Sequence, residues 1–140
     1  MNTLAQPVET ARRPRLTLWL LRVTATIQLV LVLAQPVLAG LFLTGDVDAI
    51  EVHAAVATAV AFADLVLIGV AVAYTVARGR LWVLPASVAL LVAVGLQMAA
   101  GYTRALQFHI PLGVVIVTAS VVLGIWAWTP AAARPRGGVR

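Results

Sequence analysis

The sequence contains no cysteine and no lysine, and charged residues of every kind are scarce. The lack of cysteine excludes disulfides, thiolate metal sites and covalently attached c-type haem. It still allows a b-type haem, which ligation and packing alone would hold. Only 11% of the 140 residues are charged, whereas 62% are hydrophobic. A soluble domain carries about 25% charged residues, so water is not the solvent for most of this surface.

All ten basic residues are arginines, and the formal net charge is +5. The arginines lie in short clusters beside apolar runs, so they form no basic face for a nucleic-acid duplex. Membrane flanks explain them better. The sequence also has no nucleophile–base pair, phosphate loop or metalloprotease motif, which argues against a hydrolase or a transferase. Whether the chain is an enzyme stays open.

Four apolar runs are long enough to cross a bilayer, which takes about 20 residues. The connections between them are short, and short loops make sequential helices antiparallel neighbours. The sequence therefore predicts an all-α, integral membrane four-helix bundle with up-down-up-down topology. We place the spans at about 16–43, 50–77, 81–101 and 106–129 in a bundle of residues 16–130, with disordered cytoplasmic tails over 1–15 and 131–140.

Charge assigns the sides of the bundle. Arginine clusters precede the first span, separate the second from the third, and follow the fourth. The other side carries Asp46, Asp48 and Glu51 with a single arginine, Arg104. The positive-inside rule then predicts that both termini are in the cytoplasm. We expect the membrane to be the plasma membrane. The tryptophans fall at the predicted cytoplasmic ends of the spans: Trp19, Trp82, Trp126 and Trp128.

The two histidines, His53 and His109, each open a long apolar run. The second and fourth spans run in the same direction, and both histidines are equally far from a cytoplasmic arginine, so both imidazoles start near the outer face. One turn deeper, Ala57 and Gly113 leave space for a flat macrocycle. The pair predicts axial ligation of one haem b per chain, with both residues as iron ligands. The alternative is two interfacial histidines bonded to loops. Zinc is disfavoured because it needs a third ligand.

Asp64 is the only acid in the middle of a span, and it shares the helix face of His53. Two interpretations are open, namely a proton relay below the cofactor and an interhelical hydrogen bond. The candidate partners for such a bond are Gln28, Gln97, Ser87 and Thr118.

Further residues are candidates for the cofactor site. Gln35 and Gln97 either reach a haem edge or a quinone headgroup, or bond across helices. Arg104 is placed to meet haem propionates, because guanidinium pairs with carboxylates, or else a lipid headgroup. Gly40 and Gly101, at outer helix ends, either admit the ring edge or let helices pack closely.

Three short motifs carry a family resemblance: Gln97-x-x-x-Gly101, His109-x-x-x-Gly113 and His53-Ala-Ala-x-Ala57. Over about residues 16–128 the chain resembles the four-helix haem-binding units of haem A synthase and cytochrome b561-type membrane proteins. It looks most like one half of a haem A synthase. The resemblance implies a haem b carrier. It does not imply haem A synthesis, because haem A synthase has two such halves. The chain also differs from b561-type proteins, which generally ligate two haems with more histidines.

These features predict a membrane b-type cytochrome with one bis-histidine haem near the outer face. It would exchange electrons with quinol, superoxide or a partner protein. The alternatives are a cofactor-free accessory or structural subunit, and a haem-sensing or haem-transport protein. The partners that we consider are the lipid bilayer, a quinone, a redox-partner protein and a second copy of the chain as a homodimer, but no nucleic acid.

Overall fold

The computed structural model describes residues 16–137, so the predicted tail over 1–15 and residues 138–140 lie outside it. The described part of the chain is helical and contains no strand. Its helices are α1 (Leu16–Leu43), α2 (Ala49–Val76), α3 (Val83–Tyr102), α4 (Leu106–Trp128) and α5 (Pro130–Ala133). The bounds of the four long helices agree with the predicted spans to within two residues at every end. The all-α class is therefore confirmed.

The outward surface of the bundle is apolar, and all four long helices are long and apolar enough to cross a membrane. Large side chains face outward along their length, for example Phe62 at 68%, Val115 at 60% and Ile125 at 63% exposed. Apolar surface of this extent marks a membrane or a protein partner. Repeated on four helices of membrane length, it is the surface of a multi-pass membrane protein.

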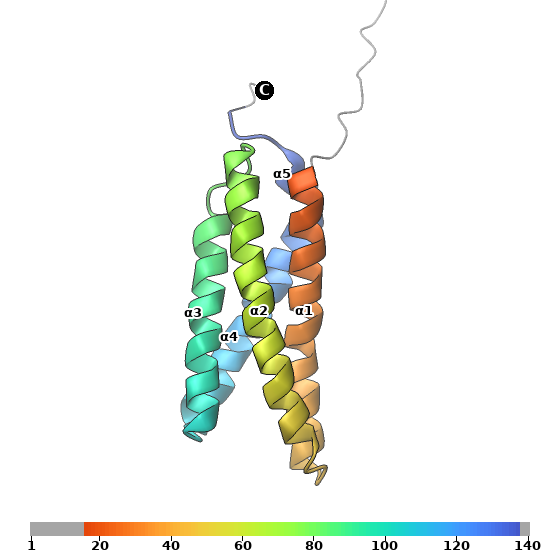
Figure 1. The fold of residues 1–140 in the computed structure, drawn as a ribbon, viewed down its shortest axis with the longest axis vertical. Coiled ribbons are helices and arrows are strands. Elements are labelled where there is room, and N and C mark those ends of the chain that lie inside the picture. The colour runs from red at the N-terminus through yellow and green to blue at the C-terminus, as the bar shows by residue number, and fades with distance from the viewer. Residues whose placement is uncertain (1–15, 138–140) are drawn as a thin grey trace, which may run out of the picture.

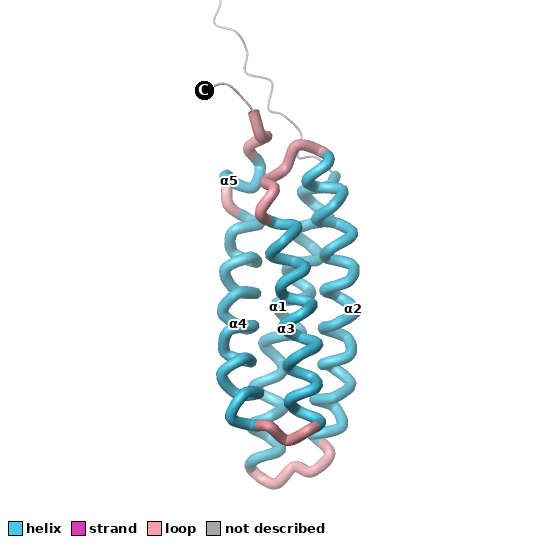
Figure 2. The backbone as a smooth tube through the Cα atoms, turned by 90° about the vertical axis from the view of Figure 1, so that its left-hand side faces the viewer, coloured by secondary structure: helices cyan, strands magenta, loops and turns pink. Residues whose placement is uncertain are grey.

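Each long helix packs against two of the others, and the packed pairs are α1–α2, α2–α3, α3–α4 and α1–α4. α2 and α4 therefore lie on a diagonal of the bundle. The α1–α2 and α3–α4 connections lie at one end, which we call the histidine end (Figure 1). The α2–α3 connection and α5 lie at the other, which we call the α5 end. Figure 2 shows the four helices running side by side between the two ends.

The interior contains a set of four branched aliphatic side chains, one from each long helix, which we call the aliphatic layer. Its members are Val32, Val60, Val94 and Ile116, at 2%, 3%, 4% and 5% exposed. All four belong to the buried hydrophobic core of the bundle. The aliphatic layer divides the interior into a part toward the histidine end and a part toward the α5 end.

The C-terminal segment differs from the prediction of a disordered tail over 131–140. Pro130–Ala133 form α5, and Ala132 is only 2% exposed. The hydroxyl of Tyr74 donates to the carbonyl oxygen of Ala132 at 2.8 Å. The backbone amide of Arg136 donates to the carbonyl oxygen of Arg78, also at 2.8 Å. The prediction took Pro130 only as a helix stop, but proline also suits the first position of a new helix.

Replacing Tyr74 with phenylalanine should loosen this docked segment. The ring would stay packed, but the buried carbonyl of Ala132 would lose its donor, which costs about 1–2 kcal/mol. We expect the free energy of unfolding in detergent to fall by that amount. Tyr102→Phe is the control, because Tyr102 is 75% exposed. An equal loss in the control would contradict the role given to the Tyr74 hydroxyl.

Candidate cofactor site

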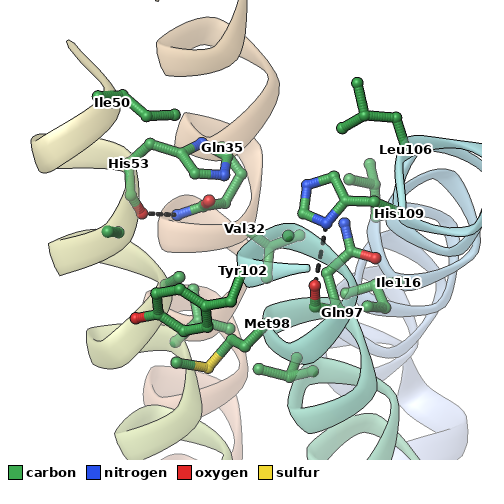
Figure 3. Close-up of a pocket in the computed structure, with 17 residues that line it drawn as sticks. Val32, Gln35, Ile50, His53, Gln97, Met98, Tyr102, Leu106, His109 and Ile116 are labelled. Atoms are coloured by element: carbon green, nitrogen blue, oxygen red, sulfur yellow. Dashed lines mark hydrogen bonds between the residues drawn. The ribbon is translucent and has the colours of Figure 1, made fainter. Parts of the chain in front are cut away.

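Both histidines line one cavity of about 270 Å³ at the histidine end of the bundle. All four long helices contribute to its wall (Figure 3). The aliphatic layer forms the deep side of the cavity. Seven residues predicted for the site lie in its wall: Gln35, His53, Ala57, Gln97, Gly101, His109 and Gly113.

The two imidazoles approach each other across the bundle from α2 and α4. Their ring centres are 6.2 Å apart, and their planes are inclined by 51°. A metal ion bound between two imidazoles is about 2 Å from one nitrogen of each ring, and each nitrogen is about 1 Å from the centre of its own ring. It would separate the ring centres by about 6 Å. The separation of the two ring centres therefore leaves room for one metal ion between the imidazoles.

His109 is oriented by the backbone of α3. Its Nδ1 atom lies 2.9 Å from the carbonyl oxygen of Gln97 (Figure 3). A carbonyl oxygen can only accept, so Nδ1 carries the hydrogen and the lone pair is on Nε2. Metal-binding histidines are commonly fixed in this way by an outer hydrogen bond. His109 is thus held in the tautomer that a metal ligand needs.

His53 is held differently. The side-chain amide of Gln35 donates to the backbone carbonyl of His53 at 3.4 Å. The ring itself lies near the backbone carbonyl of Gln35, but its buried Nδ1 makes no hydrogen bond. A glutamine on the preceding helix therefore accompanies each histidine, and only the Gln97 carbonyl bonds to an imidazole. The sequence analysis named the glutamine side chains as candidates and missed the role of the Gln97 backbone carbonyl. A pattern of side chains cannot indicate which backbone carbonyl accepts a hydrogen bond.

Two glycines of the cavity wall make close approaches to His109 and Gln97. A Cβ atom on Gly101 would lie 3.1 Å from Cε1 and 3.2 Å from Nδ1 of the His109 ring. A Cβ atom on Gly113 would lie 2.9 Å from Nε2 of Gln97. Both distances are shorter than ordinary contacts. The glycines therefore let His109 and Gln97 take their places, in addition to leaving open space in the cavity.

Three predicted site residues do not line the cavity. Gly40 lies five residues beyond Gln35 on α1 and is rotated from it by about 140°, and a Cβ atom there would meet nothing within 4 Å. Arg104 is exposed in the α3–α4 connection, where its φ of 56° turns the chain. Asp64 is completely buried on the other side of the aliphatic layer. Gly40 and Arg104 were placed by depth alone, and depth does not fix the direction of a side chain. Asp64 was placed on the helix face of His53, and it misses the cavity because it lies deeper in the bundle.

Asp64 and its predicted hydrogen-bond partners are only partly brought together. Gln28 lies beside Asp64, but the Gln28 amide donates to Ser120 at 3.0 Å. Ser87 and Thr118 donate to carbonyl groups of their own helices at 2.9 and 2.8 Å. Neither oxygen of Asp64 makes a hydrogen bond within residues 16–137.

Ten residues in the cavity wall were not among the predicted site residues. They are Val32, Ile50, Ala54, Val60, Val94, Met98, Tyr102, Leu106, Ile116 and Val117. Helical spacing would have found part of this set. Val94, Gln97, Met98 and Gly101 follow the i, i+3, i+4, i+7 pattern of one helix face.

No protein-family model matches this chain, and no curated protein or solved structure is significantly similar to it. The resemblance to haem A synthase and cytochrome b561-type proteins therefore stays a prediction. Within residues 16–137, no three His, Cys, Asp or Glu side chains lie together as a metal-binding group. The imidazole ligands that the cavity offers are His53 and His109.

Proposed function

We propose that this protein is a membrane b-type cytochrome that holds one haem b between His53 and His109. The observation that carries the proposal is the pair of imidazoles whose centres are 6.2 Å apart across a shared cavity. Two imidazoles are a known axial ligand set for haem iron in helical bundles. Bound haem would supply one-electron redox chemistry.

The residues around the pair fit such a group. The Gln97 carbonyl orients His109 at 2.9 Å, and the wall is largely apolar, as cofactor sites generally are. The volume of about 270 Å³ is near the lower end of ligand sites, which is about 300 Å³. Binding a macrocycle therefore requires flexible wall residues to turn outward. Met98 and the exposed Tyr102 are the side chains suited to this movement.

We further propose an up-down-up-down topology in the plasma membrane with both termini in the cytoplasm. At the α5 end the arginines are Arg78, Arg80, Arg134 and Arg136, and at the histidine end the charged residues are Asp46, Asp48, Glu51 and Arg104. The positive-inside rule then places the α5 end in the cytoplasm.

The tryptophans support a membrane interface at the α5 end, and the orientation rests on the arginines. Trp19 and Trp128 have ring centres 5.6 Å apart, and Trp82 and Trp126 are 4.5 Å apart. Clustered tryptophans are typical of a membrane interface. The haem would then lie near the outer face and exchange its electron there with quinol, superoxide or a partner protein.

Purification in detergent from haem-replete cells tests the proposal. We expect a reduced-minus-oxidised spectrum of the b type, and no such spectrum from the His53→Ala/His109→Ala double variant. A preparation that is colourless and stays colourless after haemin is added would favour a cofactor-free membrane subunit. In oriented vesicles, an impermeant reductant should reach the haem from the outer side. Reduction from the cytoplasmic side alone would contradict the proposed orientation.

A further inference from the structure

A second polar site lies beyond the aliphatic layer, on the side of the α5 end. It consists of Asp64 on α2, Gln28 on α1 and Ser120 on α4, which are 0%, 1% and 1% exposed. Each lies four residues, or one helical turn, from a member of the aliphatic layer on the same helix. The site is therefore separate from the cavity that holds the histidines.

The hydrogen bonds of this site leave three acceptors without a donor. The Gln28 amide nitrogen donates to the Ser120 hydroxyl at 3.0 Å. The other atom of that amide, Gln28 Oε1, has no partner, and neither do Oδ1 and Oδ2 of Asp64. Gln28 nevertheless lies beside Asp64. Buried polar atoms are normally hydrogen-bonded, so the missing component is a donor.

Within the four long helices, no free positive charge is available to supply that donor. Arg22 is the only arginine inside the four long helices. Its Nε donates to the carbonyl oxygen of Ala127 at 3.0 Å, and its guanidinium lies 5.3 and 5.1 Å from the ring centres of Trp19 and Trp128.

The helices around α2 also lack other titratable groups at this level. Apart from Arg22, α1 has none, α3 has only Tyr102 at its C-terminal end, and α4 has only His109 in the cavity. An ionised Asp64 would thus be a buried charge without a counter-ion, which costs several kcal/mol in a membrane.

We propose that Asp64 is a membrane-embedded proton-binding site. In the resting protein its carboxyl group is neutral, and its O–H donates to Oε1 of Gln28. This completes a hydrogen-bond chain from Asp64 through Gln28 to Ser120 that joins α2, α1 and α4. A proton suits the site better than a metal cation, because it supplies the missing donor and leaves the site neutral.

The aliphatic layer determines what the proton can do. Its four side chains contain no donor or acceptor, so they provide no hydrogen-bonded route from Asp64 to the histidines. Asp64 therefore holds its proton and does not relay it toward the cavity. This proposal does not depend on haem and applies to the cofactor-free protein.

Infrared spectroscopy of the cofactor-free protein in detergent at neutral pH tests the site. We expect the carbonyl band of a protonated carboxylic acid, shifted down in D₂O and absent in Asp64→Asn. Gln28→Leu should move the band up, because the acceptor is lost. Glu51→Gln is the control, since Glu51 is exposed, and it should leave the band unchanged.

Asp64→Asn should still fold, because its amide can donate to Gln28 in place of the acid. Should it fail to fold, ¹³C-labelling of aspartate in the native protein identifies the band by its isotope shift, since the other two aspartates, Asp46 and Asp48, are exposed. Absence of a protonated-acid band overturns the proposal. A second result would also overturn it. If sodium chloride gives the native protein a higher melting temperature than choline chloride does, and Asp64→Asn shows no such difference, then an ionised Asp64 binds a cation.

Discussion

Replacing either His53 or His109 with alanine should abolish six-coordinate, low-spin haem. Removing an outer partner of a metal ligand alone costs about 10–100-fold in affinity, so loss of a ligand should weaken haemin binding by at least about 100-fold. We expect the larger loss in His109→Ala, because His109 is fixed by the Gln97 carbonyl at 2.9 Å and the Nδ1 of His53 makes no hydrogen bond. Haemin titration followed by absorption spectroscopy measures both effects.

Gln107→Ala is the matched control for the histidine variants. Gln107 is exposed, lies two residues before His109 on α4 and does not line the cavity. It should bind haemin as the native protein does. If either histidine variant kept the native low-spin spectrum, the two imidazoles would not be the ligand pair, and His53 and His109 would be ordinary interfacial histidines.

Gly101→Leu should abolish haem binding without unfolding the bundle. A Cβ atom at this position already lies 3.1 Å from the His109 ring, so a leucine side chain must displace the imidazole. Leucine is also a better helix former than glycine, and we therefore expect helix content by circular dichroism to be unchanged. The affinity for haemin should fall about as far as it does in His109→Ala.

Gly40→Leu is the corresponding control on α1. Gly40 and Gly101 both lie near the histidine ends of their helices, but a Cβ atom on Gly40 meets nothing within 4 Å. Gly40→Leu should keep both helix content and haemin affinity. Equal losses in the two variants would show that helix packing, and not the position of His109, accounts for the effect.

Hydropathy was sufficient to predict the four long helices, because each apolar run is bounded by charged or proline-containing segments. Equal distances along the sequence from arginines at the α5 end also placed His53 and His109 at a common depth, and in the structure their ring centres are 6.2 Å apart. The prediction of a common depth depends only on the rise of a helix per residue. That rise does not vary with tertiary contacts.

Direction around the helix was harder to predict. Gly40 was grouped with Gly101, and Arg104 with the haem propionates, yet neither Gly40 nor Arg104 lines the cavity. Arg104 follows the end of α3 with a positive φ of 56°, and a sequence pattern does not specify where such a turn sends the side chain.

Some hydrogen-bond partners also could not be predicted from the sequence. The hydrogen bond from His109 to Gln97 uses a carbonyl group that every residue has. Similarly, Gln28 was correctly named as a neighbour of Asp64, but Ser120 was missed as the acceptor of its amide. These pairings depend on the relative rotation of the four long helices, which side-chain packing determines.

Quantitative electron paramagnetic resonance of the ferric protein tests the central claim most directly. After reconstitution with haemin, the account predicts a low-spin signal of six-coordinate haem that integrates to one spin per chain, with both His53 and His109 required for it. A predominantly high-spin signal, or no haem signal from a folded protein, would contradict the claim that the two histidines hold one haem between them.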